Sequence, residues 1–194
     1  MTRIPGVGSD DPRNPHHHDE QRDATTMTTD AYSFAGPLAT IHDPEFFRTW
    51  VDDEDFIARL IQADDPEVRE TKRIAVEFQR QMAYAVGSGD LAGRIDSVLE
   101  EFIDEGYQQH DQHLADGREP LSRFFKGAAA AGVDMWPPMP VAVVVEGDIA
   151  ALILAAATPD GGQRFIPTAF RVGGGKMTEH WSAAAPPPGS VAQD

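Results

Sequence analysis

The sequence predicts an α+β protein, with helices in the first part of the chain and an antiparallel sheet in the second. Apolar residues recur at helical spacing from residue 46 to residue 131, and short apolar runs joined by "EGD", "PDGG" and "GGGK" follow "MWPPMP". Helices followed by a meander of strands are typical of α+β folds rather than of alternating α/β folds. The 194 residues suffice for one domain with a core and for its tails.

Three aspartates mark the expected helix starts. Asp43 and Asp65 each precede a proline, which fits the first helical position, and Asp90 precedes "LAGRIDSVLEEFIDEG". "GSGD" is expected to end the helix after Asp65, Gly106 the helix after Asp90, and another helix is expected over 118–131. The residues expected to face the core are Phe46, Phe47, Trp50, Val51, Phe56, Ile57, Leu60, Ile61, Ile74, Phe78, Met82, Ile95, Val98, Leu99, Phe102, Ile103, Leu121, Phe124 and Phe125.

Four strands are expected over 141–145, 149–157, 164–172 and 176–182. Glycine-rich turns separate them, as in hairpins. "GGGK" resembles a phosphate-binding loop, but it joins two expected strands and no helix follows it. We therefore expect a hairpin turn there.

The composition excludes several classes of partner. Lysine and arginine total 16 against 32 aspartates and glutamates, so the field of the molecule repels phosphate backbones and anionic membrane surfaces. The most apolar region, "VAVVVEGDIAALILAAA", is interrupted by charges and reads as a hairpin rather than a membrane span. With no cysteine and no signal-peptide core at its start, the chain is expected to be cytoplasmic, without nucleic-acid or membrane partners.

The two ends of the sequence differ in composition from the middle. Residues 1–30 are rich in Asp, Pro, Thr and His and almost free of large apolar side chains, so we expect a disordered tail. The Pro-rich residues 184–194 are expected to form a second tail. Met27 is an alternative start to Met1.

From about residue 70 to residue 182, the chain resembles the SnoaL-like polyketide cyclase branch of the nuclear transport factor 2-like superfamily. The resemblance rests on "YQQHD", "DGRE", the "EGD" turn and the closing "FRV", "GK" and "EHW" segments, in the order and spacing of that branch. It covers a little over half of the chain.

The resemblance implies a cone-shaped barrel in residues 70–183, with the N-terminal helices packed on a curved antiparallel sheet and an apolar pocket between them. It also implies a homodimer formed through the sheet. Residues 31–69 have no counterpart, and we expect a helical N-terminal extension that serves as a lid or adds to the dimer face.

In this family the histidine of "YQQHD" tends to face the cavity, which makes His110 the first candidate base. Imidazole titrates near neutrality and can take a proton from carbon next to a carbonyl. Tyr107 and His180 would hold the developing oxyanion, and Gln109 would orient the substrate. The alternative is that His110 only bonds a buried backbone carbonyl.

His180 lies in "TEHWS", where strand alternation puts it on one face with Thr178 and Ser182, unless a bulge intervenes. Glu179 and Trp181 would point the other way. The plain interpretation of Glu179 is a solvated strand charge, and that of Trp181 is an aromatic of the core or of a dimer interface.

Two positions depart from the family pattern. Ser182 stands where relatives commonly have a carboxylate, and Thr168 where an aspartate often precedes "FRV". Leu152 occupies a position where a polar side chain is frequent, and Phe170 and Trp136 are expected to add apolar walls. All five are candidate substrate-binding residues. A hydroxyl is no general base without an activating partner, which leaves histidine chemistry or plain binding.

Metal binding is the third interpretation of the histidines. "HDQH" supplies His110 and His113, and "HHH" lies at residues 16–18. A metal site needs three or more converging ligands, and no cysteine assists, so we expect neither a metal nor any other cofactor.

Two functions of different class remain. The first is a cofactor-independent cyclase or isomerase that acts on a hydrophobic, polyketide-like carbonyl compound by histidine-based proton abstraction. The second is a non-catalytic protein of the same fold that binds a hydrophobic small molecule or serves in assembly.

Overall fold

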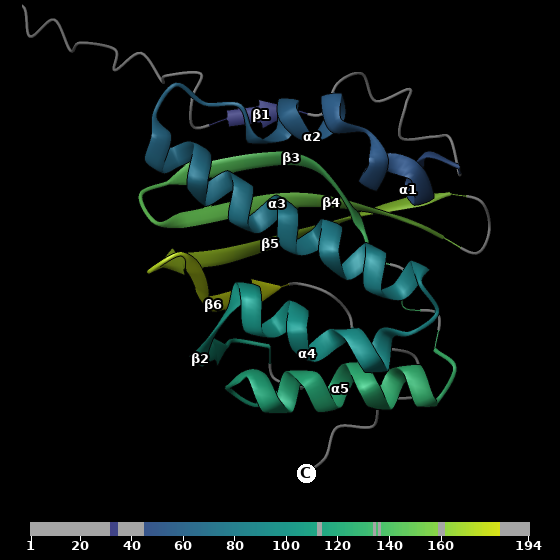
Figure 1. Ribbon diagram of the computed structural model, residues 1–194. Helices are drawn as coiled ribbons and strands as arrows, with labels where there is room; N and C mark the ends of the chain where they lie inside the picture. The colour runs from purple at the N-terminus through teal and green to yellow at the C-terminus, as the bar shows by residue number, and fades with distance from the viewer. Residues whose placement is uncertain are drawn as a thin grey trace, which may run out of the picture.

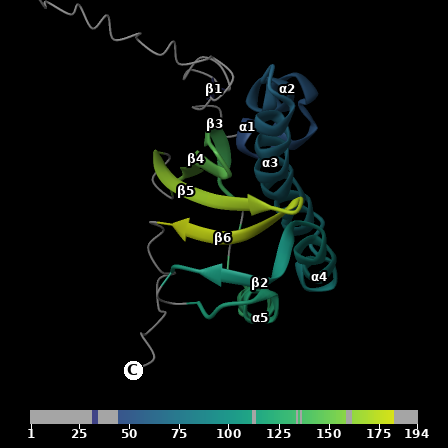
Figure 2. The same cartoon turned by 90° about the vertical axis from the view of Figure 1, so that its left-hand side faces the viewer.

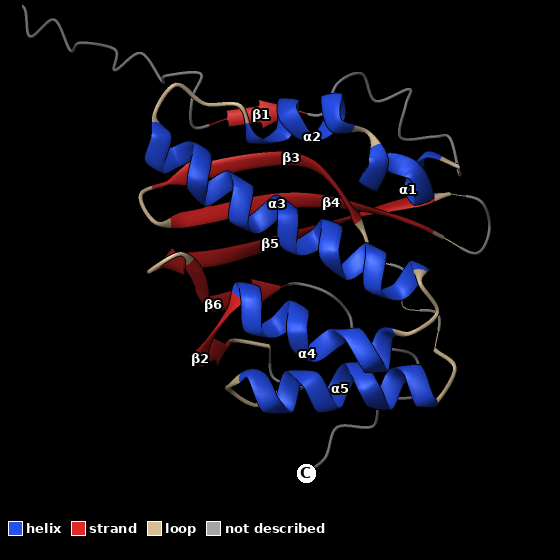
Figure 3. Ribbon diagram, in the orientation of Figure 1, coloured by secondary structure: helices blue, strands red, loops and turns tan. Residues whose placement is uncertain are grey.

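The computed structural model describes residues 32–34, 45–111, 114–133, 135, 137–158 and 162–182 (Figure 1). Figure 3 shows helices and strands in separate layers, which confirms the predicted α+β class. The helices are α1 (Phe46–Thr49), the 3-10 helix η3 (Trp50–Asp52), α2 (Glu54–Ile61), α3 (Pro66–Gly87), α4 (Leu91–Phe102) and α5 (Arg118–Ala130). The strands are β1 (Tyr32–Phe34), β2 (Ile103–Gln109), β3 (Met139–Glu146), β4 (Ile149–Ala157), β5 (Gln163–Gly173) and β6 (Lys176–Ser182).

The six strands form one sheet in the order β1-β3-β4-β5-β6-β2. Every neighbouring pair is antiparallel except β2 and β6, which run parallel, so the prediction of a wholly antiparallel sheet is wrong at this pair. The sheet is curved and α1 to α4 lie against one of its faces (Figure 2). Because β1 and β2 are its two edges, the described sheet does not close into a barrel. The cone shape stays a prediction.

Aspartate caps begin helices α3 and α4 as predicted. The Asp65 carboxylate accepts hydrogen bonds from the backbone N–H groups of Glu67 (2.7 Å) and Val68 (3.2 Å). Asp90 accepts one from the N–H of Gly93 at 3.2 Å. The expected cap at Asp43 and Pro44 lies outside the described residues.

The prediction that Gly106 ends a helix is wrong. Helix α4 ends at Phe102, and Ile103 is already extended, with φ −110° and ψ 133°. From there the chain joins β6 in the sheet, and Gly106 lies inside β2. Pairing with a distant strand therefore overrides the local helical pattern of "EEFIDEG".

The first helices belong to the same core as the sheet. Trp50, Phe56 and Leu60 are at most 2% exposed. Two side chains of α3 reach back to this region: Arg80 Nε donates to the Val51 carbonyl at 2.7 Å, and Lys72 Nζ to the Gln62 carbonyl at 2.9 Å. The expected boundary between residues 69 and 70 falls inside α3. None of the helices in the described part of the chain combines the length and apolar character that a bilayer span requires.

Candidate functional site

An apolar cavity of about 320 Å³ lies between α3, α5 and the β2, β5 and β6 end of the sheet. Two larger hollows, of about 560 Å³ each, lie at the surface and are lined mainly by charged side chains, so the apolar cavity is the candidate site. Its apolar lining consists of Phe78, Met82, Leu114, Leu121, Phe124, Phe125, Met135, Pro137, Pro138, Leu154, Ile166 and Phe170.

Strand pairing brings the polar lining together. The parallel register sets Gln109 of β2 beside His180 of β6, and the antiparallel register sets Thr168 of β5 beside Ser182. Tyr107 lies two residues before Gln109 and therefore faces the same side of the sheet. All five of these side chains line the cavity. A bulge at Arg171/Val172 in the β5–β6 pairing lets the buried Met177, rather than Thr178, pair with Val172.

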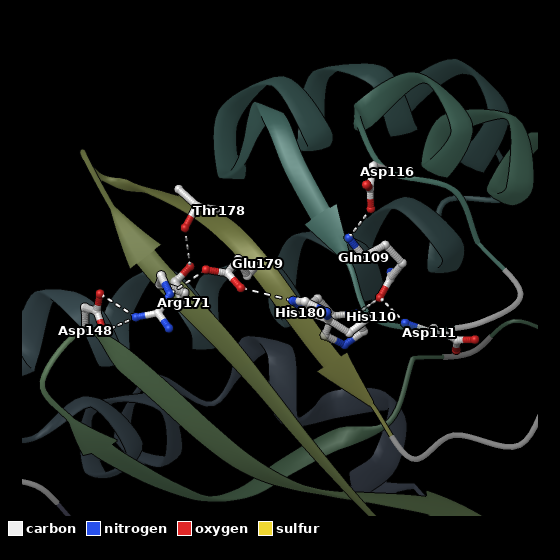
Figure 4. Close-up of polar contacts among 9 residues, drawn as sticks. All are labelled: Gln109, His110, Asp111, Asp116, Asp148, Arg171, Thr178, Glu179 and His180. Carbon is white, nitrogen blue, oxygen red and sulfur yellow. Dashed lines mark hydrogen bonds and ion pairs between the residues drawn. The ribbon is translucent and has the colours of Figure 1, made fainter.

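His180 is held between two polar partners. Its Nδ1 lies 3.1 Å from Gln109 Oε1, and its Nε2 lies 2.8 Å from Thr168 Oγ1 (Figure 4 shows the first pair). The backbone N–H of Asp111 donates to the same Gln109 oxygen at 3.1 Å, which fixes that atom as an acceptor. The Nδ1 atom of a neutral His180 must therefore carry the proton, and Nε2 accepts from the Thr168 hydroxyl.

Burial keeps His180 uncharged. Desolvation lowers its pKa to about 4, and the charge of nearby Asp111 opposes this shift without cancelling it. Its ring stacks on Phe170, with centroids 4.7 Å apart and planes 12° apart. At neutral pH, His180 is thus a neutral hydrogen-bonding group rather than a strong base.

Tyr107 presents a phenol to the cavity and is 2% exposed. Desolvation raises the pKa of Tyr107 above its usual range, and a hydrogen bond with the Gln109 side chain acts in the opposite direction. Gln109 Oε1 already accepts from two donors, so the interaction with the phenol is left to the NH2 group, which cannot accept the phenol proton. The O–H proton of Tyr107 is then left to donate to a ligand.

The expectation that His110 faces the cavity does not hold. Its side chain is 40% exposed, Nε2 lies 3.0 Å from Glu179 Oε2, and the ring stacks on Trp181 at 4.7 Å. Figure 4 shows the chain of polar contacts continuing from Glu179 through Arg171 to Asp148. His110 follows Gln109 directly, so alternation sends it to the outer face of the sheet. The predicted outward direction of Glu179 and Trp181 fits these contacts.

The remaining predicted residues divide into three groups. Thr168, Phe170 and Ser182 line the cavity. Leu152 does not; it is 1% exposed and belongs to the core cluster. Trp136 lies outside the described residues.

Two lining residues were missed by the sequence analysis. Asp111 follows β2 and is the one carboxylate among the described residues that line the cavity. Gln79 lies on α3 between cavity-lining Phe78 and Met82. A glutamine inside a buried apolar stripe was the available signal, because long polar side chains are rarely fully buried.

Within the described ranges, no cluster of three or more histidine, aspartate or glutamate side chains could hold a metal ion. His113 and residues 16–18, which carried the metal interpretation, lie outside those ranges.

No family model and no curated protein matches this chain. Solved structures similar to it include a de novo designed protein with a curved β-sheet, at 13% identity and TM-score 0.42, covering 60% of this chain and 84% of that one. A proposed polyketide cyclase of Acidithiobacillus ferrooxidans matches at 17% identity and TM-score 0.39 over 58% of this chain and 86% of its own. A proposed polyketide cyclase of Bacillus cereus matches at 23% identity and TM-score 0.40, covering 60% of this chain and 74% of its own. At these TM-scores and identities, the likenesses carry no argument about family or activity.

Proposed function

We propose that this protein binds an uncharged, apolar small molecule that carries a carbonyl oxygen, with that oxygen against Tyr107. The observation that carries the proposal is the buried phenol at the cavity wall, whose O–H donates to no carbonyl or carboxylate among the described residues. Phenols in apolar surroundings bind carbonyl oxygens because no water competes for the donor.

Two other polar groups of the cavity, His180 and Thr168, fit an uncharged ligand. His180 is neutral, and both of its ring nitrogens face protein partners. Thr168 Oγ1 also lies 3.2 Å from the Trp181 carbonyl, so its hydroxyl has a second protein acceptor. Shape, apolar contact and the Tyr107 phenol would therefore each contribute to specificity.

The test compares 2-acetylnaphthalene with 2-ethylnaphthalene, which has the same shape but no carbonyl, in titration calorimetry with wild-type and Tyr107→Phe protein. We expect the ketone to bind wild type more tightly. Tyr107→Phe should weaken ketone binding by about 5- to 10-fold, which corresponds to about 1 kcal/mol for one hydrogen bond, and leave the hydrocarbon unaffected. An equal loss for both molecules, or no binding of either, would contradict the proposal.

The second candidate function is the cyclase or isomerase activity of SnoaL-like enzymes, and Asp111 favours it. A carboxylate beside the cavity can take a proton from the carbon next to the ligand carbonyl. The electron pair of the broken C–H bond then forms a C=C bond, and the charge on oxygen is held by the Tyr107 O–H. His180 fits the accepting role less well, because its pKa is about 4 and its Nε2 faces Thr168.

Deuterium exchange separates binding from this chemistry. In D2O, an enzyme of this kind exchanges the methyl protons of 2-acetylnaphthalene faster than buffer alone, as followed by NMR. Asp111→Asn should lower the enzymatic rate roughly a hundredfold, the usual effect of losing a general base, while binding persists. His110→Gln is the matched control and should exchange at the wild-type rate. Exchange no faster than in buffer would leave binding as the function.

A further inference from the structure

We infer that Gln79 recognises a second polar group of the ligand, a hydroxyl or carbonyl on the part of the molecule away from Tyr107. The inference rests on the proposed binding function and narrows its ligand class. The ligand would be a hydroxylated or doubly oxygenated ketone with an apolar body, rather than a simple ketone.

The observation is a largely buried glutamine that lines the cavity and has no hydrogen-bond partner among the described residues. Gln79 is 6% exposed and lines the cavity. Its side chain makes no hydrogen bond or ion pair with any residue in the described part of the chain. An amide offers two donors and an acceptor, and leaving such a group unmet in apolar surroundings is unfavourable.

A neighbouring residue shows what a structural polar group on the same helix looks like. Lys72 is 0% exposed, and its Nζ donates to the Gln62 carbonyl at 2.9 Å. The protein itself therefore supplies a hydrogen-bond acceptor for this buried ammonium group. Gln79 lies two helical turns further along α3 and has the cavity beside it instead of a carbonyl. Its burial is therefore explained by what enters the cavity rather than by what holds the helix.

The placement of Gln79 also separates it from the first polar group. Tyr107 and its partners come from the β2 and β6 end of the sheet, whereas Gln79 comes from the helix that covers the sheet (Figure 2). A molecule that contacts both walls needs one oxygen at each. The apolar lining between them, Phe78, Met82 and Phe170 among others, fits a ring system as the connecting body.

The test uses two matched pairs of probes that differ by one hydroxyl: acetophenone with 4-hydroxyacetophenone, and 2-acetylnaphthalene with 6-hydroxy-2-acetylnaphthalene. Dissociation constants are measured for wild type, Gln79→Leu and Gln81→Leu. Gln81 is the control, because it lies on the same helix but lines a surface hollow with Arg73 and Glu77. The melting temperature of each protein without probe is also recorded.

In wild type and Gln81→Leu, we expect the hydroxyl to strengthen binding roughly tenfold in at least one pair, as one additional hydrogen bond does. In Gln79→Leu this advantage should disappear while the ketone without hydroxyl binds as before. The melting temperature of Gln79→Leu should not fall, because an unpartnered amide is replaced by an apolar group of similar size.

Two results would overturn the inference. One is the absence of a hydroxyl advantage in both pairs when the simple ketones do bind; the other is an advantage that survives in Gln79→Leu. A lower melting temperature together with unchanged probe affinities would assign Gln79 a structural role. If no ketone binds wild type, the proposed function itself fails, which distinguishes the two failures.

Discussion

Two histidines, His180 and His110, lie on opposite faces of the sheet where β2 meets β6, and their surroundings differ in charge. On the inner face, His180 is neutral and its contacts with Gln109 and Thr168 carry no formal charge. On the outer face, His110 meets the charged Glu179, which also contacts Arg171. The comparison teaches that a histidine motif acquires its chemistry from the face it occupies. The inner face suits an uncharged ligand, and the outer face suits solvent or another protein surface.

The largest expected effect contrasts one aromatic from each face. Phe170 is 2% exposed and packs edge-on against Phe78, so Phe170→Ala should lower the free energy of unfolding by about 3–5 kcal/mol. Trp181→Ala should cost less, because Trp181 is partly open to solvent and stacks on an exposed imidazole. Urea unfolding of both variants measures the difference. Equal losses would mean that the outer face is covered as well as the inner one.

The second effect concerns pH. Because the pKa of His180 falls from 6.5 to about 4 on folding, the unfolded chain takes up the proton first as the pH is lowered. The free energy of unfolding should therefore be highest above about pH 6.5, where His180 is neutral in both states. It should fall by about 3 kcal/mol in total as the pH is lowered towards 4.

Urea unfolding at several pH values checks this expectation. His180→Gln should remove that part of the pH dependence, whereas His110→Gln should retain it. A wild-type profile that matches His180→Gln would show that the inner histidine is not held neutral.

The third and smallest effect tests the outer face as a dimer surface. Cross-strand neighbours Val144, Ala151, Ala169 and Trp181 form a row there, and Ile153 is 40% exposed beside it. We expect a homodimer through this face, because no described helix covers it and small side chains allow close approach (Figure 2).

Ile153→Glu should raise the dimer dissociation constant at least about tenfold, or about 1.4 kcal/mol, in sedimentation equilibrium. Val133→Glu is the control, since Val133 is 44% exposed but lies after α5, away from the sheet. A wild-type monomer at micromolar concentration would exclude the dimer.

Much of the fold could be predicted because its signals are local. The residues that follow Asp65 and Asp90 identify these aspartates as helix caps, and glycines identify the hairpin turns. Strand β2 could not be predicted in this way. Its sequence "IDEGYQQ" has little strand character, and it is held by β6, which follows much later in the chain.

The same missed strand explains the error at the site. The family resemblance placed Tyr107, Gln109 and His110 together at the cavity. In a strand, the first two share a face and the third takes the other, so all three cannot line one cavity. Gln79 needed a different signal, since its polarity is unusual only once its helix face is known to be buried.

The parallel pairing of β2 with β6 also affects when the cavity forms during translation. Gln109 meets His180 only after 71 further residues have been added, and β6 lies between β5 and β2 in the sheet. At ordinary elongation rates, this takes roughly 4 to 14 s. Throughout that interval, the growing chain has β2 without its neighbour in the sheet. Ribosome-associated chaperones would meet this protein in that state, and β6 would complete the ligand site last.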